Sequence, residues 1–143
     1  MKLITALLLF LLASGVHSQP AEHCPVLPPD VKLIWSYQEG PDFGVCYAVE
    51  PSTERTAFGI YLGYAPKFEP AQEKSIGKGD IGGHIVKWYE RSSFYITSDP
   101  AEFSQETVVK IDRNGMSAHV WVLATSDQEL EQRLSILSKL RFR

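Results

Sequence analysis

Polar and apolar side chains alternate along residues 81–91, near the middle of the chain. A period of two residues is the pattern of a β-strand with one buried face. Val86 and Trp88 share one side of this predicted strand with His84 and Glu90, and their apolar bulk makes it the core side. The strand pattern continues over residues 92–97, and the opposite side carries Ile85, Lys87, Tyr89 and Arg91.

Five further segments show strand-like alternation, over residues 31–37, 43–49, 55–64, 107–111 and 116–124. In the second of these segments Cys46 lies opposite the face that carries Val45 and Tyr47. In the third, glycines flank Tyr61 and leave a shallow surface, which we interpret as bare backbone covered by a neighbouring aromatic ring. A groove with Tyr61 as its contact is the alternative interpretation.

Residues 65–80 form a polar connection that is long for a loop without regular structure. It runs into a glycine-rich stretch, residues 76–83, that surrounds Lys78. Backbone N–H groups in such a stretch can cup an anion, but the glycine spacings of phosphate-binding and dinucleotide-binding loops are absent from the sequence. We therefore predict a flexible turn into the central strand, with an anion-binding loop as the alternative.

The last part of the chain predicts a hairpin and then a helix. Asn114-Gly115 between two alternating runs is a strong hairpin signal, because both residue types tolerate positive φ. Ser126 and Glu129 have the spacing of a capping box at the start of a helix. This helix has an apolar stripe made of Leu130, Leu134, Ile136, Leu137 and Leu140.

Together these elements predict an α+β fold, with a twisted, mostly antiparallel sheet of about six or seven strands and the C-terminal helix packed on one face. A closed calycin-like barrel with the helix outside is the alternative. The ending, a long strand, a serine-capped helix and then Leu140-Arg141-Phe142, resembles the ending of small exported α+β domains of the PsbP-like kind. That resemblance implies a fold and no activity.

Residues 1–18 have the pattern of a secretory signal peptide. Lys2 gives a positive start, residues 3–12 are apolar but too short to anchor in a bilayer, and cleavage fits after Ser18 or after Gly15. We predict an exported protein, either secreted or placed in a bacterial periplasm or envelope, with no stable membrane anchor after cleavage. Its mature part is expected to be one α+β domain over residues 19–143, led by a proline-rich extended segment over residues 19–30.

The chain has two cysteines, Cys24 and Cys46, and an exported setting favours a disulfide between them. A lipid-modified Cys24 and two free thiols are the alternatives. The formal net charge of -3 becomes more negative when Lys2 is removed with the signal peptide, which argues against nucleic acid as a partner.

No catalytic, metal-binding or cofactor motif is present in the sequence. His84 lies near Asp80 and Glu90 along the chain, and a carboxylate can orient and charge an imidazole. A sheet histidine satisfied by a backbone carbonyl is the simpler interpretation. A small secreted hydrolase that uses His84 and a nearby carboxylate remains the alternative function.

Amphipathic and cationic side chains share the non-core face of the central strand, and such a face suits a partner or an anionic ligand. A solvated face, with the charged ends of these side chains in water, is the simpler interpretation. We predict a non-enzymatic exported module, without a cofactor or metal, that binds a protein, polymer or small ligand through the sheet face and the 65–84 loop. The candidate contacts are Tyr61, Lys78, His84, Lys87, Tyr89 and Arg91.

Overall fold

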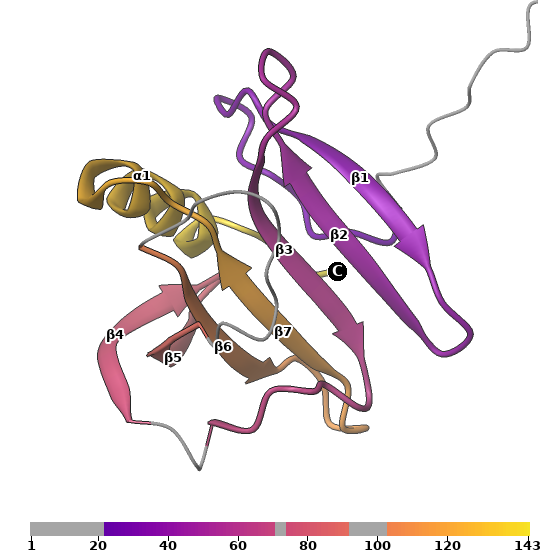
Figure 1. The fold of residues 1–143 in the computed structure, drawn as a ribbon. Helices are drawn as coiled ribbons and strands as arrows, with labels where there is room; N and C mark the ends of the chain where they lie inside the picture. The colour runs from indigo at the N-terminus through magenta and orange to yellow at the C-terminus, as the bar shows by residue number, and fades with distance from the viewer. Residues whose placement is uncertain (1–21, 71–73, 92–102) are drawn as a thin grey trace, which may run out of the picture.

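The computed structural model describes residues 22–70, 74–91 and 103–143, and these form an open antiparallel sheet with one helix on it (Figure 1). The order of the strands across the sheet is β1-β2-β3-β7-β6-β5-β4, so β1 and β4 are its edges. The predicted α+β fold is confirmed, and the closed-barrel alternative is wrong. In chain order the elements are β1 (Ile34–Glu39), β2 (Phe43–Val49), β3 (Thr56–Gly63), β4 (Ser75–Ile81), β5 (His84–Glu90), β6 (Gln105–Lys110), β7 (Ser117–Val122) and α1 (Asp127–Ser138).

The prediction of a structureless connection over residues 65–80 is wrong, because β4 occupies its second half and pairs with β5. Glycine and lysine are depleted in strands, and they make up much of β4, so its composition resembles a loop. As an edge strand it is also largely exposed, which removes the apolar alternation that marks the other strands. The signal peptide predicted over residues 1–18 and the strand predicted over residues 92–97 lie outside the described residues.

A tight turn at Gly82 and Gly83 joins β4 to β5. Their φ values of 56° and 88° fit a type I′ hairpin turn, which needs positive φ at both central residues. The Gly83 N–H donates to Asp80 Oδ1 at 2.9 Å, and the Gly82 N–H donates to the Leu137 carbonyl at 3.0 Å. The second bond attaches the hairpin to the C-terminal end of α1.

The hairpin predicted at Asn114-Gly115 is confirmed and joins β6 to β7. Asp112 Oδ1 accepts the backbone N–H groups of Asn114 and Met116, both at 2.9 Å, and Gly115 has a φ of 94°. The turn fixes the pairing of Lys110 with Ser117 and hence the register of the whole hairpin.

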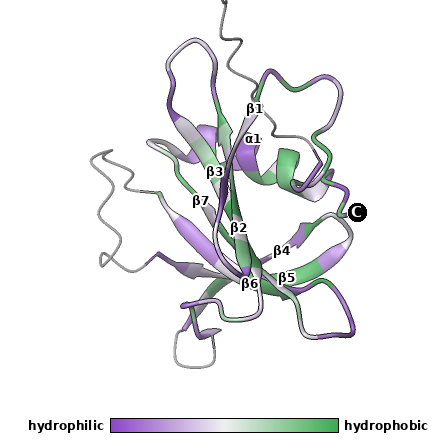
Figure 2. Cartoon of the chain, turned by 90° about the vertical axis from the view of Figure 1, so that its right-hand side faces the viewer, coloured by the Kyte–Doolittle hydropathy of each residue, from purple (hydrophilic) through white to green (hydrophobic). Residues whose placement is uncertain are grey.

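The main core lies between the sheet and α1. Ile60 of β3 and Val120 of β7 are cross-strand partners at its centre, and neither side chain is accessible to water. Trp88 of β5 is 3% exposed, which confirms the core side predicted for the central strand. In Figure 2 α1 carries both hydrophobic and hydrophilic segments, as an amphipathic helix on a sheet must. The buried apolar residues of α1 are Leu130 and Leu137, and Leu140, two residues beyond its end, is also buried.

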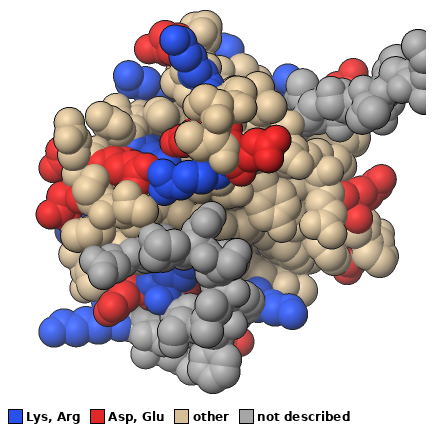
Figure 3. Space-filling model, turned by 45° about the horizontal axis from the view of Figure 1, so that its top comes forward, with Lys and Arg blue, Asp and Glu red and all other residues tan. Residues whose placement is uncertain are grey.

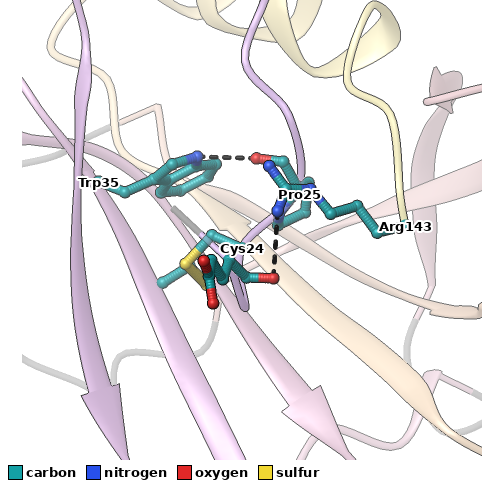
Figure 4. Close-up of a disulfide and its surroundings, with 6 residues drawn as sticks. Cys24, Pro25, Trp35 and Arg143 are labelled. Atoms are coloured by element: carbon teal, nitrogen blue, oxygen red, sulfur yellow. Dashed lines mark hydrogen bonds between the residues drawn. A yellow bond between two sulfur atoms is a disulfide. The ribbon is translucent and has the colours of Figure 1, made fainter. Parts of the chain in front are cut away.

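Cys24 and Cys46 form the predicted disulfide, and both are buried. The bond joins the proline-rich lead to the middle of β2, on the same face of the sheet as α1 (Figure 4). The lead has further attachments. The indole N–H of Trp35 donates to the Pro25 carbonyl at 2.8 Å, and Val26 forms an isolated antiparallel bridge with Arg141.

Arg133 of α1 is a buried cation that joins the helix to the β2–β3 turn. Its guanidinium donates to Glu50 Oε1 at 2.8 Å, to Glu129 Oε1 at 2.7 Å and to the Leu123 carbonyl. Basic and acidic side chains also adjoin one another in the view of Figure 3, and neither sign covers that face alone. The ion-paired cluster of Arg133, Glu50 and Glu129 is thus a structural contact between the helix and the sheet.

Two carboxylates of this cluster titrate below their usual range. Burial raises the pKa of Glu50, but hydrogen bonds from Thr53 and Arg133 and nearby positive charge outweigh it, so its pKa lies below 4.5. Burial likewise raises the pKa of Glu129, and bonds from Thr125 with the Arg133 charge bring it below 4.5. Both groups therefore stabilise the fold in their ionised form.

The helix cap differs in one detail from the predicted capping box. Ser126 is the N-cap, and its Oγ accepts the N–H of Glu129 at 3.2 Å. The Glu129 carboxylate reaches back one residue further than expected, to the N–H of Thr125 at 2.7 Å and its hydroxyl at 2.9 Å. The other oxygen of this carboxylate binds Arg133.

Candidate functional site

The face of the sheet turned away from α1 carries a continuous series of rings, here termed the aromatic face. Strand alternation places its members opposite the core residues, and the pairing of β3 with β2 and β7 brings them side by side. Tyr47 and Trp121 both lie beside Gly59, and Tyr61 lies opposite His119. The face consists of Phe43, Tyr47, Tyr61, Tyr89, His119 and Trp121, with Phe68 packed on it from the β3–β4 connection.

The rings from β2, β3 and β7 form the first half of this face. Phe43 and Tyr61 are stacked, with ring centroids 5.3 Å apart and planes inclined by 27°. Tyr47 meets Trp121 edge to face at 6.0 Å. All four side chains are half-buried, so they pack on one another and still leave apolar surface exposed.

Trp121 rests directly on the backbone of β3 at Gly59. A β-carbon at position 59 would lie 2.8 Å from Cη2 of the indole and closer still to two of its other atoms. Gly63 is covered in the same way by the ring of Tyr61. The interpretation that neighbouring rings cover the bare backbone of this strand is confirmed.

The second half of the face surrounds His119. Its ring lies 5.6 Å from the Trp121 ring, and Phe68 stacks on it at 5.4 Å with planes inclined by 14°. Phe68 also meets Tyr89 at 5.5 Å. The β3–β4 connection thus reaches across β7, and its Phe68 side chain closes over the histidine.

Beneath Phe68, His119 Nε2 lies 2.8 Å from Glu106 Oε2. Glu106 is 1% exposed and His119 is 8% exposed, so the pair sits in a medium where a lone charge is costly. The two residues are diagonal neighbours across the β6–β7 hairpin, because Glu106 is paired with Trp121. A carboxylate in this position fixes the orientation of the imidazole.

Arg91 follows β5 and extends this polar centre. Its guanidinium carbon lies 5.8 Å from the centre of a Trp121 ring, within the range of a cation–π contact. Trp121 is therefore in contact with both the backbone of Gly59 and the cation of Arg91. The arrangement provides a rigid apolar surface with charged groups beside it.

The predicted contacts fall into three groups. Tyr61, Tyr89 and Arg91 all lie at the aromatic face, although Tyr89 is buried beneath Phe68 and not presented at the surface. The structure thus brings these three residues together around Trp121 and His119, which the sequence had not selected.

Lys78 and Lys87 form the second group and are directly opposite each other on β4 and β5. By alternation from Tyr89 they point to the same side of the sheet as the aromatic face, and both are exposed. Two like charges in this position repel each other. Asp80 is on the same side of β4, so the two lysines and this one carboxylate leave this side of the hairpin with a net positive charge next to the rings.

His84 is separate from the others. It lies on the α1 side of the sheet, half-buried, with its ring edge-on to Phe142 at 5.8 Å. Among the described residues it makes no ion pair with a carboxylate: Asp80 accepts the Gly83 N–H, and Glu90 is about 20 Å further along an extended strand.

Sequence reasoning missed Phe68, Glu106, His119 and Trp121. For the pair of Glu106 with His119 a signal was present, because the Asn114-Gly115 turn sets the hairpin register and makes the two residues diagonal neighbours. Phe68 is the one aromatic residue of a polar connection, but nothing local indicates the strand over which it folds.

Comparisons of the chain with models of protein families, with curated proteins and with solved structures give no match. Within the described ranges, no helix has the length and apolar character needed to cross a membrane.

Proposed function

We propose that this protein is an exported, non-enzymatic binding module that holds its ligand on the aromatic face. The observation that supports this most directly is the set of half-buried rings, Phe43, Tyr47, Tyr61, Phe68 and Trp121, on the side of the sheet without a helix. Exposed apolar surface that is contiguous and rimmed by polar groups is typical of binding sites. Export is supported by the signal-like start of the chain and by the buried disulfide.

The chemistry of the face describes its ligand, whether protein, polymer or small molecule. Fixed rings favour a ligand with flat or cyclic apolar parts, because little side-chain entropy is lost when it binds. Lys78 and Lys87 at the β4–β5 end favour a negative group on the same ligand. A binding role is favoured over a hydrolase built on His84, because that ring packs on Phe142 at the opposite side of the sheet.

A test uses anilinonaphthalene sulfonate, a dye that combines aromatic rings with a negative charge. We expect saturable binding to the folded mature protein, with quenching of Trp121 fluorescence. Trp35 and Trp88 are on the other face, so their fluorescence serves as an internal reference. A Trp121→Phe variant keeps only this reference emission, and the difference from the unmodified protein gives the Trp121 signal. Native mass spectrometry of protein purified from its own compartment would identify a natural ligand.

Two tyrosines provide the matched variants for this test. Tyr61→Ala removes a ring of the aromatic face and is expected to weaken dye binding about tenfold, as loss of a good stacking contact does. Tyr64 is 57% exposed and follows the end of β3, so Tyr64→Ala should leave binding unchanged. Equal binding by the two variants, with circular dichroism showing both folded, would contradict the proposed site.

A further inference from the structure

The outer edge of β4 is open along its first half. Among the described strands β4 is the last of the sheet, and β5 is its single strand neighbour (Figure 1). Residues 74–78 are all exposed, whereas Ile81 at the other end is buried near α1. A β-carbon added to Gly77 would meet no atom within 4 Å. An extended chain can therefore approach this stretch without displacing anything described.

The hairpin turn determines which backbone groups face outward. In a type I′ turn the residues flanking the two glycines, Ile81 and His84, form a hydrogen-bonded pair. Bonded and non-bonded pairs alternate along an antiparallel ladder, so Gly79 and Gly77 also bond to β5. The N–H and C=O groups of Lys78 and Asp80 then point away from β5, and no other described segment bonds to them. They can therefore bind an added strand.

The side chains of β4 define what such a strand would carry. Lys78 and Lys87 form a non-hydrogen-bonded pair, the kind in which opposite side chains approach most closely. Two positive charges are therefore close together at this point of the hairpin. An added acidic side chain beside Lys78 on this face would meet both cations. On the other face Gly77 leaves open space next to β5, which suits an apolar side chain.

We infer that β4 is a docking strand for an extended segment of a partner protein in which acidic and apolar side chains alternate. The partner strand adds to the sheet edge through the backbone of Lys78 and Asp80, and its acidic side chains lie over Lys78 and Lys87. This inference rests on the proposed function, because it names a partner for the β4–β5 end of the aromatic face.

The test titrates the mature protein with a capped six-residue peptide of alternating glutamate and valine, and with a lysine–valine peptide as the control. Amide hydrogen exchange by NMR gives the position of binding. In the free protein the amides of Lys78 and Asp80 should exchange quickly and those of Gly77 and Gly79 slowly. The acidic peptide should slow exchange at Lys78 and Asp80, and the basic peptide should not.

Variants at position 78 separate charge from backbone. Lys78→Ala keeps the outward N–H and should weaken peptide binding about two- to fivefold, as loss of an exposed ion pair does. Lys78→Pro also removes that N–H, which an edge strand tolerates, and should weaken binding more than about tenfold. Lys110→Ala changes an exposed lysine at the end of β6 and should have no effect. If the proline variant does not fold, Lys87→Ala and the exchange data decide the question.

Several results would overturn the inference. Binding of both peptides with equal affinity, protection at β1 in place of β4, or no protection at all would each do so. Self-association of Lys78→Ala without peptide binding would show that the lysine only guards the edge against other strands. Dye binding measured on the same samples separates the two proposals, because its survival would leave the aromatic face intact as a site.

Discussion

Gly59→Ala is a direct test of the contact that builds the aromatic face. The added methyl group would overlap the indole of Trp121, because it lies 2.8 Å from Cη2 and closer to two neighbouring atoms. Overpacking of this kind costs about 1–3 kcal/mol. Replacing glycine also lowers the conformational entropy of the unfolded chain, which stabilises the folded state by about 0.4–1 kcal/mol. We therefore expect the free energy of unfolding to fall by about 1–2 kcal/mol.

Gly77→Ala is the matched control for this substitution. Gly77 is also in a strand with negative φ, but its added methyl group meets no atom within 4 Å. Only the effect on the unfolded chain remains, so we expect no loss and a gain of up to about 1 kcal/mol. Urea unfolding followed by circular dichroism measures both variants. In a thermal melt, a difference of 1 kcal/mol corresponds to a shift in Tm of about 4 °C for a domain of this size.

A double-mutant cycle assigns the cost to the indole itself. In a Trp121→Ala background the ring is absent, so Gly59→Ala should keep only the effect on the unfolded chain, a gain of up to about 1 kcal/mol. The coupling energy is then the overpacking cost itself, about 1–3 kcal/mol. If Gly59→Ala costs as much without the ring as with it, or is as stable as Gly77→Ala, the placement of Trp121 on Gly59 is wrong.

Three further predictions concern the fold. Alkylation of the unreduced folded protein should modify no cysteine in an intact-mass measurement, and replacing Cys24 and Cys46 together by serine should cost ~3 kcal/mol, the loop-closure value. Trp88→Ala should cost ~3–5 kcal/mol in urea unfolding as a buried aromatic truncation, while its neighbour Lys87→Ala should cost under ~0.5 kcal/mol; similar losses would mean that the faces of β5 are exchanged. The pKa values of Glu50 and Glu129 are lowered in the folded state, so their stabilisation is present above pH 4.5 and is lost as the pH falls through the folded values. Unfolding measured from about pH 6 to about pH 3 should show this loss, and Glu129→Gln should flatten the curve while the exposed Glu131→Gln should leave it unchanged.

The strands with one buried face were predictable because alternation is a local signal. Residues 43–49 became β2 within the predicted bounds, and the opposite directions of Cys46 and Tyr47 followed from the period of two. β4 was not predictable in this way. It is stabilised by pairing with β5 and by the contact of its turn with Leu137, and neither interaction leaves an apolar pattern in its own residues.

The same distinction between local patterns and tertiary contacts holds for the residues of the candidate site. Tyr61, Tyr89 and Arg91 were selected because each stands out within its own strand or at its end. Their grouping around Trp121 and His119 depends on the order of the strands, which places β7 beside β3 although more than 50 residues separate them along the chain. His84 was selected on sequence proximity to Asp80, but strand geometry put its ring on the other side of the sheet, against Phe142.

The sequence by itself determined the α+β class, the faces of the regular strands, the hairpin at Asn114-Gly115, the C-terminal helix and the disulfide of Cys24 with Cys46. Each of these depends on residues close together in the chain, or on a choice with very few alternatives. Only the tertiary structure decided that β4 is an open edge, that Phe68 covers the buried pair of His119 and Glu106, and that Trp121 lies on Gly59. These features arise from contacts between distant segments, whose register and order local patterns do not encode.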